Sequence, residues 1–325
     1  MILFAAAGIF LFSLAVTLAV TRILIPYLQK KKLGQSILKI GPRWHKSKEG
    51  TPTMGGIVFL LVIPFAALSG AFFLTETEDM LPLLFILGYA LLNGSIGILD
   101  DMTKFKKHEN EGLLPWQKLF LQTIFTGAFL FFYQTHVTDL TALPMPFLPF
   151  APAMAFVAFF LLAFVMIGTV NCANLSDGID GLAGSVSFII GIFFAAEGHL
   201  TQNTALFSLG VAMCGCMLGF LYFNHNPAHI FMGDTGSLFL GALAVGGAFL
   251  LERPLSVLIF GVLYIIEGIS VVLQVLTFKR TGKKLFLMAP LHHHLERKGL
   301  SENTIVICAI LVTAASCATA HFIAL

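Results

Sequence analysis

The chain has 325 residues, of which 57% are hydrophobic and only 11% are charged. Apolar residues on this scale, gathered in long stretches, exclude a soluble globular domain and a disordered chain. The formal net charge of +2 by itself indicates no partner, and the positions of the charges are more informative. The five cysteines form no spacing typical of a metal site or a disulfide framework, so we interpret them as apolar filler.

Ten apolar runs divide the chain. A helix needs about 20 apolar residues to cross roughly 30 Å of hydrocarbon, and the runs are continuous rather than alternating, which favours helices over a β-barrel. We therefore predict an all-α fold, a polytopic membrane helix bundle with about ten transmembrane helices that forms a single integral membrane catalytic domain over residues 1–325. The runs are 2–27, 52–73, 81–99, 116–135, 152–170, 181–197, 204–223, 237–251, 254–278 and 303–324.

The basic residues are one-sided. All Lys and Arg except Arg22 and Arg253 lie in the alternate loops 28–51, 100–118 and 279–302. Loops rich in Lys and Arg face the cytoplasm, so we predict both termini on the extracytoplasmic side. The first run lacks a preceding basic segment and is too long for a signal peptide, which predicts an uncleaved span. The opposite loops are mostly acidic, with Glu76, Glu78, Asp79, Asp139, Glu197 and Glu252.

Asp100 and Asp101 directly follow the third run, with Lys104 one helical turn further on. Two adjacent carboxylates repel each other, and a divalent cation or a shared proton relieves that repulsion. Oxygen ligands near phosphate-binding groups suit Mg²⁺, and Lys104 is placed to meet a phosphate. A solvated helix end is the alternative interpretation of this pair.

The predicted cytoplasmic loop 171–181 carries Asn171, Asn174, Asp177 and Asp180 but neither Lys nor Arg. Its carboxylates therefore require a metal ion or a remote lysine. The alternative is a hydrophilic turn whose polar residues cap the flanking helices.

The predicted cytoplasmic loop 224–236 contains Asn224, Phe231 and Asp234. Asp234 lies in a Gly-Asp-Thr-Gly segment, where exposed backbone N–H groups and a helix N-terminus favour phosphate or a metal-bound phosphate. The ring of Phe231 could stack on a nucleobase, or it could anchor the chain at the membrane interface.

His292, His293 and His294 lie in the last basic loop. Three consecutive imidazoles cannot all point one way in a helix, so at most two would serve one site. No further ligands complete a zinc site, whereas contacts to phosphate or sugar, or proton transfer, fit imidazole near neutral pH; a plain polar loop is the alternative. Glu267 is an intramembrane carboxylate that requires an interior partner, which could be catalytic or structural.

Five motifs together resemble the polyprenyl-phosphate N-acetylhexosamine-1-phosphate transferase superfamily. They are Thr-Pro-Thr-Met-Gly-Gly at 51–56, Asp-Asp-x-x-Lys at 100–104, Asn-x-x-Asn-x-x-Asp-Gly-x-Asp-Gly-Leu at 171–182, Asn-x-x-Pro-Ala-x-Ile-Phe-Met-Gly-Asp-Thr-Gly-Ser at 224–237 and Ala-Pro-Leu-His-His-His at 289–294. The resemblance runs essentially end to end. The last motif favours the muramoyl-pentapeptide branch over the GlcNAc-linked and dolichol-linked branches.

The resemblance implies a reaction. Undecaprenyl phosphate attacks the β-phosphate of UDP-N-acetylmuramoyl-pentapeptide, which releases UMP and forms lipid I, the first membrane step of peptidoglycan synthesis. It also implies a Mg²⁺ requirement, ten spans, a cytoplasmic active-site cleft in a bacterial plasma membrane, a homodimer and no nucleic-acid partner.

Roles for individual residues follow from that reaction, which joins two anions and so depends on cations and alignment. Asp234 is expected to be the principal Mg²⁺ ligand, with Asp100 and Asp101 beside it, and Asp100 is expected to deprotonate the residual lipid-phosphate monoanion. We expect the histidines to contact sugar or phosphate. The expected substrate-binding residues are Lys48, Thr53, Lys104, Lys118, Asn171, Asn174, Asp177, Asn224, Phe231 (stacking on uracil) and Gln274.

Two other functions are compatible with parts of the pattern. A UDP-GlcNAc:polyprenyl-phosphate GlcNAc-1-phosphate transferase would use the same chemistry on another sugar. An ion transporter would use the acidic clusters as a vestibule, but transport sites are usually near the bilayer midplane, and these carboxylates crowd one boundary.

Overall fold

The computed structural model describes residues 2–31, 48, 50–74, 80–107, 112–140, 143 and 155–323, and these residues contain helices but no strand. Three of the helical elements are short: η5 (Pro254–Ser256), α9 (Val257–Phe260) and α11 (Leu291–Arg297). The long helices are α1 (Ile2–Lys30), α2 (Ile57–Leu74), α3 (Met80–Lys107), α4 (Pro115–His136), α5 (Ala155–Leu175), α6 (Leu182–Leu200), α7 (Thr204–Asn224), α8 (Gly233–Leu250), α10 (Val262–Thr281) and α12 (Glu302–Phe322).

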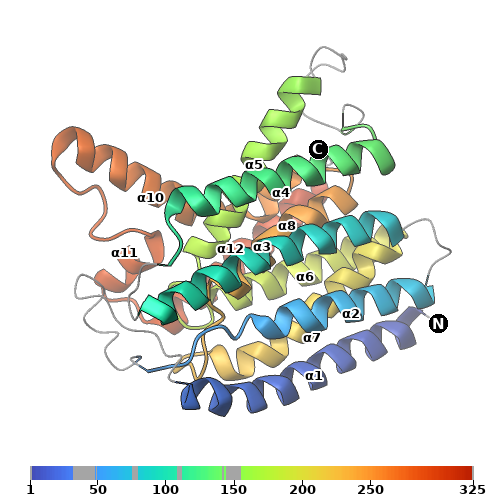
Figure 1. The fold of residues 1–325 in the computed structure, drawn as a ribbon, viewed down its shortest axis with the longest axis horizontal. Helices are drawn as coiled ribbons and strands as arrows, with labels where there is room; N and C mark the ends of the chain where they lie inside the picture. Colours follow the sequence, from blue (N-terminus) through green and yellow to red (C-terminus); the bar gives the residue numbers. More distant parts are fainter. Residues whose placement is uncertain are drawn as a thin grey trace.

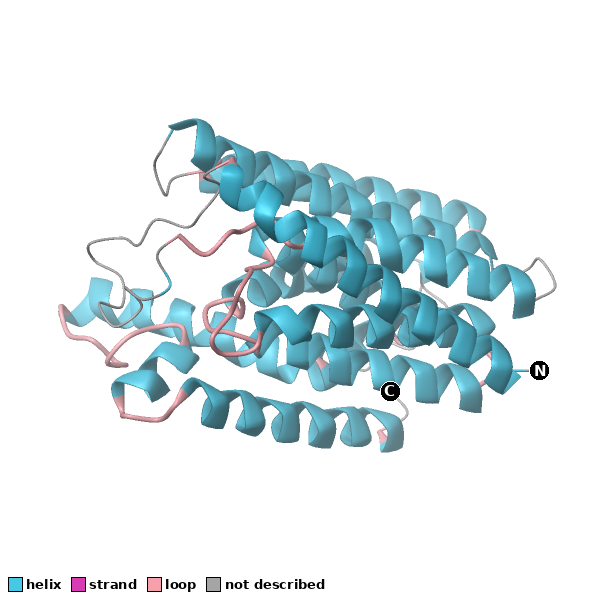
Figure 2. Ribbon diagram, turned by 90° about the horizontal axis from the view of Figure 1, so that it is seen from below, coloured by secondary structure: helices cyan, strands magenta, loops and turns pink. Residues whose placement is uncertain are grey.

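Within the described residues, nine of the long helices are long and apolar enough to cross a membrane. The remaining one, α4, packs along α3 in the same bundle (Figure 1), and Gln117, Lys118 and Gln122 interrupt its apolar sequence. The predicted polytopic helix bundle is therefore confirmed. Most of the loops lie at the end of the bundle opposite the N-terminus (Figure 2). The C-terminal end of α3 and helix α11 lie at that same end (Figure 1).

Helix α8 is the centre of the bundle, because 89% of its most apolar stretch is buried. A helix that is apolar on all sides is stable when neighbours cover it completely. Helices α3 and α5 pack on α8, α6 packs on α7, and α1 and α2 cover α7 (Figure 1). Helix α10 leans away from this core, and only 28% of its most apolar stretch is buried.

Two glycines let neighbouring backbones approach the first turn of α8. A Cβ atom on Gly97 of α3 would lie 2.3 Å from the carbonyl oxygen of Asp234, and one on Gly56 would lie 2.2 Å from the Cα atom of Gly236. Real Cβ contacts are not this short, so any side chain at either position would force the segments apart. These contacts bring the end of α3 and the segment before α2 against the start of α8.

Several helices extend beyond the predicted runs. Helix α3 continues through Asp100 and Asp101 to Lys107, α5 continues to Leu175, and α8 begins at Gly233. The run predicted as one span at 254–278 is wrong as a single helix, because the chain forms η5 and α9 and then starts α10 after Gly261. The predicted loop 279–302 contains α11.

Some sequence predictions lie outside the described residues. Most of the basic loop 28–51 does, at 32–47 and 49, and so does the acidic segment 75–79.

Candidate active site

The end of α3 places two carboxylates and a lysine on adjoining turns. Asp100 and Asp101 are buried, with 0% and 2% exposure. The Nζ atom of Lys104 lies 2.7 Å from Oδ2 of Asp100 and 3.7 Å from Oδ1 of Asp101. The spacing of four residues brings Lys104 over Asp100 on one helix face. The loop before α4 closes over Asp100, whose Oδ1 accepts the N–H of Leu113 at 2.8 Å.

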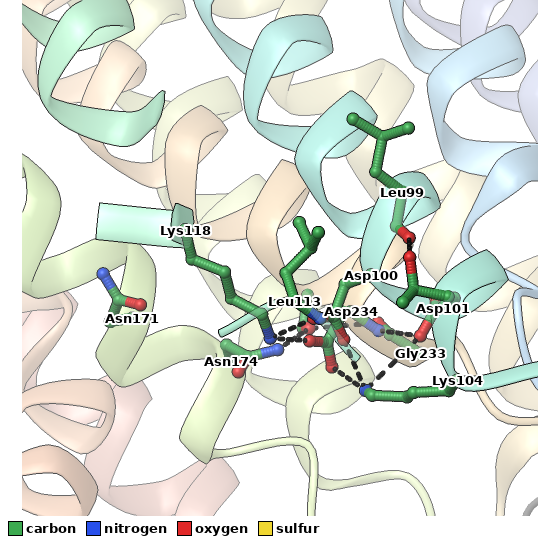
Figure 3. A network of polar contacts seen from close by, with 12 residues as sticks. Leu99, Asp100, Asp101, Lys104, Leu113, Lys118, Asn171, Asn174, Gly233 and Asp234 are labelled. Atoms are coloured by element: carbon green, nitrogen blue, oxygen red, sulfur yellow. Dashed lines mark hydrogen bonds and ion pairs between the residues drawn. The ribbon is translucent and has the colours of Figure 1, made fainter. Parts of the chain in front are cut away.

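Helices α4 and α8 complete a charged cluster with α3 (Figure 3). Pro115 occupies the first turn of α4, and the side chain of Gln117 accepts the N–H of Leu114, which fixes the helix start that carries Lys118. The Nζ atom of Lys118 lies 2.8 Å from Asp100 Oδ1 and 2.6 Å from Asp234 Oδ2.

Lys104 also reaches Asp234, at 3.3 Å from Oδ1. Three carboxylates and two ammonium groups from three helices thus form one network, with a formal charge of −1 if every group is ionised. We call Asp100, Asp101, Lys104, Lys118 and Asp234 the charged cluster.

Asp101 caps the first turn of α8. Its carboxylate accepts the N–H of Asp234 at 3.3 Å, and both the N–H and the hydroxyl of Thr235, at 3.0 and 2.7 Å. The first N–H groups of a helix have no partner within the helix, and their aligned dipoles attract an anion. Met232, at the N-cap position, provides no side-chain acceptor, so the carboxylate from α3 takes that role.

The charged cluster has the donor set of a hard-cation site. One carboxylate oxygen from each of Asp100, Asp101 and Asp234 lies within 4.8 Å of the other two, and this is the single such group of metal-ligating side chains in the described part of the chain. Ligand oxygens about 2.1 Å from Mg²⁺ lie roughly 3–4 Å apart in an octahedral shell, so small side-chain movements suffice. Oδ1 of Asp100 and Oδ2 of Asp101 already accept two contacts each. The other oxygen of each of these residues and both oxygens of Asp234 have at most one close contact and keep a lone pair. The three residues fit a divalent cation.

The turn between α5 and α6 lies beside the cluster. The side chain of Asn174 donates to Ser237 Oγ of α8 at 2.8 Å, whereas Asn171 turns to Gln122 of α4, also at 2.8 Å (Figure 3). Asp177 lies in the turn itself. Burial, reinforced by repulsion from the carboxylates of Asp234, Asp101 and Asp180, raises the pKa of Asp177 to about 8.

Lys48 belongs to a second ion-pair group. Its Nζ lies 2.7 Å from Asp180 Oδ1 and 2.7 Å from Glu302 at the start of α12. The backbone N–H of Asp180 also donates to Glu302, at 3.0 Å. The other oxygen of Asp180 accepts from Asn226 and from the N–H of Ala228. Sequence reasoning placed Lys48 opposite a phosphate and did not select Glu302, an ordinary acidic residue in the first turn of a helix.

The segment before α2 and the segment before α8 are joined by backbone hydrogen bonds. Phe231 donates its N–H to Pro52 and accepts from the N–H of Gly55, both at 2.8 Å. Thr53 lies beside the cluster, because a Cβ on Gly233 would lie 2.8 Å from Thr53 Oγ1 and 2.6 Å from Asp101 Oδ2. Phe231 is partly buried and lies two residues before Gly233.

Asn224 joins two loops and is buried. Its amide oxygen accepts the N–H of Gly181 at 3.2 Å, and its amide nitrogen donates to the carbonyl of Ile230 at 2.8 Å. Both ends of the side chain thus bond to the protein, and each end can make one further hydrogen bond. The expected contact of Asn224 with the nucleotide or sugar stays a prediction.

The three histidines lie on α11 and face three different neighbours. His292 is fully buried, with Nδ1 3.2 Å from Glu267 Oε2. His293 Nδ1 lies 2.6 Å from Glu296 Oε2. His294 Nδ1 accepts the N–H of Leu287, so that nitrogen carries no proton while the bond persists. Glu267, for which the sequence required an interior partner, has His292.

Gln274 supports the loop before α11. Its amide oxygen accepts the N–H groups of Leu285 and Phe286, at 3.1 and 2.8 Å, and its amide nitrogen donates to the carbonyl of Phe286 at 3.2 Å.

Known proteins are similar to this sequence over most of its length. A family model described as glycosyl transferase family 4 matches residues 83–252, and the phospho-N-acetylmuramoyl-pentapeptide-transferase signature 1 matches residues 48–60. The phospho-N-acetylmuramoyl-pentapeptide-transferase of Levilactobacillus brevis is 43% identical over 291 residues, which cover 88% of each chain. The enzyme of that name from Clostridium botulinum is 39% identical over 308 residues, covering 94% of this chain and 93% of the relative.

The helix bundle, the charged cluster at one of its ends and the family match define a membrane-embedded transferase of the glycosyl transferase family 4 class. The relatives and the signature are more specific than that class. The chain belongs to the phospho-N-acetylmuramoyl-pentapeptide-transferase family.

Proposed function

We propose that this chain transfers phospho-N-acetylmuramoyl-pentapeptide from its UDP derivative to undecaprenyl phosphate, giving lipid I and UMP. The observation that carries the proposal is the charged cluster: carboxylates and lysines from α3, α4 and α8 meet at one end of an apolar bundle. A lipid-linked phosphate and a water-soluble nucleotide can meet at such a boundary. The family membership supports the choice of sugar and peptide.

The reaction is one phosphoryl transfer. An oxygen of the lipid phosphate forms a bond to the β-phosphorus of the nucleotide, and the bond from that phosphorus to the bridging oxygen breaks, so UMP leaves with the bonding electrons. Both reactants are anions, and the lipid phosphate, with a second pKa of about 6, is mostly dianionic at pH 7. The barrier is therefore mainly charge repulsion and alignment. Asp100 would accept the proton of the minor monoanionic fraction.

Lys104 and Lys118 would supply the cationic charge. Each ammonium group now bridges carboxylates of different helices, at the point where phosphates would enter. Asp100, Asp101 and Asp234 would hold Mg²⁺, which when bound neutralises charge on phosphate oxygens. Because Asp101 also caps α8, we assign Asp234 and Asp100 the larger share of this role.

The turn 177–181 and the loop before α8 would bind the nucleotide and sugar. Asn174 bonds to Ser237 of α8, and the carboxylate of Asp177 is repelled by those of Asp101 and Asp234. Thr53 and Phe231 lie on the joined segments before α2 and α8. Phe231 remains our candidate for stacking on uracil. Asn171, His293, His294 and Gln274 stay predictions as substrate contacts, and Lys48 would act together with its partner Asp180.

We further propose the setting of the reaction. The one-sided Lys and Arg distribution supports a cytoplasmic active site and extracytoplasmic termini. The similarity to bacterial proteins supports a bacterial plasma membrane as the location. The whole chain would act as one catalytic domain, and a homodimer stays an expectation.

The deciding experiment uses purified protein in detergent with undecaprenyl phosphate and Mg²⁺. UDP-N-acetylmuramoyl-pentapeptide should yield UMP and lipid I, identified by mass spectrometry, whereas UDP-GlcNAc should yield no lipid product. The reverse preference would identify a GlcNAc-1-phosphate transferase. Ion uptake into proteoliposomes without UMP release would identify a transporter. Asp234→Asn should abolish turnover and serves as the inactive control.

The alternative to direct attack is a two-step route through an aspartyl-phosphate, and a trapped phosphoprotein would support that route and exclude direct attack. Rapid quenching of the enzyme with labelled nucleotide and no lipid acceptor should yield none.

A further inference from the structure

Glu267 caps a helix that is not its own. It lies in the second turn of α10 and is buried, with 4% exposure. Its Oε2 accepts the backbone N–H of His292 at 3.2 Å, one of the N–H groups in the first turn of α11 that have no partner within the helix. Pro290, at the N-cap of α11, makes no side-chain cap. The carboxylate of α10 therefore determines where α11 begins.

The same carboxylate faces the ring of His292. Nδ1 of this fully buried imidazole lies 3.2 Å from Glu267 Oε2. The Nε2 edge lies against the turn between α5 and α6, because a Cβ on Gly178 would lie 2.1 Å from Nε2 and 2.6 Å from Cε1. Position 178 thus leaves room for the ring only when it is glycine. Gly178 directly follows Asp177, whose carboxylate is repelled by those of Asp234 and Asp101.

Neither ring nitrogen of His292 makes a hydrogen bond to any described residue. Buried polar atoms without a partner are rare in native proteins and call for an explanation. The two neighbouring imidazoles differ in this respect, since His293 bonds to Glu296 and His294 accepts from Leu287. Of the three, His292 is the ring of which both nitrogens are buried without a hydrogen bond to a described residue.

We propose that Glu267 is a positioning residue for the transfer reaction. A small rotation of the imidazole lets Nδ1–H donate to Glu267, which fixes the tautomer and leaves Nε2 as an acceptor directed at the turn 177–178. Because the ring is fully buried against Gly178, a hydroxyl or a protonated phosphate oxygen of the substrate would complete the bonding of Nε2 only once the turn 177–178 has moved away from the ring. A carboxylate behind an imidazole orients the ring in this way in other enzymes. This inference rests on the proposed function, because it concerns the same substrate.

The first test compares matched substitutions. Glu267→Gln should lower kcat roughly 10- to 100-fold and leave KM for the UDP substrate within about twofold. Glu197→Gln is the control, because Glu197 is also buried and contacts a histidine, His321. Glu197 lies near the far end of α6, about 22 Å along the helix from its first turn. Its substitution should leave kcat within about twofold.

A double-mutant cycle separates positioning from a general structural role. If Glu267 acts through His292, adding Glu267→Gln to His292→Ala should cause no further loss of kcat. Losses that multiply would overturn the proposal, as would a Glu267→Gln variant as active as Glu197→Gln. Gly178→Ala tests the geometry from the other side, since its methyl group would displace the ring; full activity in that variant would also contradict the proposal.

A spectroscopic test does not require turnover. Long-range ¹H–¹⁵N spectra of ¹⁵N-histidine protein in detergent report which ring nitrogen carries the proton, and His292→Ala identifies the signal of His292. The proton should be on Nδ1 in the wild type and should redistribute in Glu267→Gln. Identical tautomers in both proteins would overturn the positioning role. If the wild type makes no lipid I, the proposed function fails, whereas the spectra still decide whether Glu267 positions His292.

Discussion

The cap on α8 predicts that the three clustered carboxylates differ in their contribution to stability. Asp101→Asn keeps one acceptor oxygen but removes the charge. It also turns an amide nitrogen, which is itself a donor, toward N–H and O–H groups that now donate to the carboxylate. Loss of an anion at a buried helix start costs about 1–2 kcal/mol, and one donor left without a partner costs about 1–3 kcal/mol. Lower repulsion within the cluster offsets part of this, so we expect a net loss of about 2 kcal/mol.

Asp234→Asn should cost less. The side chain of Asp234 pairs with Lys104 and Lys118, and both lysines also pair with Asp100. The substitution also takes the formal charge of the cluster from −1 to neutral. Because both ammonium groups keep a carboxylate partner and no helix cap is removed, we expect a smaller loss than that of Asp101→Asn.

Reversible unfolding in mixed micelles, titrated with SDS and followed by helical circular dichroism, measures both values. Activity cannot separate the two variants, because both should lose turnover. Equal destabilisation, or a greater loss for Asp234→Asn, would refute the assignment of Asp101 as the helix cap.

Three further predictions concern packing, pH and cation affinity. Gly97→Ala puts a methyl group 2.3 Å from the carbonyl oxygen of Asp234, so it should abolish turnover and lower the unfolding midpoint, whereas Gly88→Ala, whose methyl meets nothing within 4 Å, should do neither. Because burial raises the pKa of Asp177 from 3.8 to about 8, this group makes the folded state less stable as pH rises from 4 to 8. The free energy of unfolding of Asp177→Asn should therefore increase relative to that of the wild type as pH rises from 4 to 8, and the difference should stay constant above pH 8. SDS titrations at several pH values measure this difference. Lys118→Gln should bind Mg²⁺ more tightly by titration calorimetry but turn over more slowly, since it removes one of two cations.

The number of long helices could be predicted because hydrophobic length is a property of each segment alone. The start of α8 could not. The polar residues at 233–236 look like a turn, and the predicted run began at 237, yet the helix begins at Gly233. The cause is Asp101 on α3, 133 positions away, which accepts the N–H groups of the first turn. The start of α11 likewise depends on Glu267 of α10.

The meeting of Asp100, Asp101 and Asp234 could be expected from sequence, because all three lie where apolar runs end on the same predicted face. Which lysine pairs with which carboxylate could not be predicted from the sequence. Lys48 pairs with Asp180 and Glu302 rather than with the charged cluster, and nothing in the sequence around Glu302 distinguishes it from an acidic residue that favours any helix start.

The lysines show why stability and activity are difficult to separate at this site. Lys118 of α4 contacts carboxylates of both α3 and α8, and Lys104 of α3 also reaches α8. The two lysines that would meet the substrate phosphates therefore also hold three helices together when no substrate is bound. A lysine that leaves its carboxylates for a phosphate exposes buried negative charge, with Asp100 at 0% exposure, and burial makes such a charge costly unless a cation replaces it. Substrate and divalent cation should for this reason bind cooperatively. The cation neutralises the carboxylates that the lysines leave, and the substrate phosphates take up the lysines that the cation displaces.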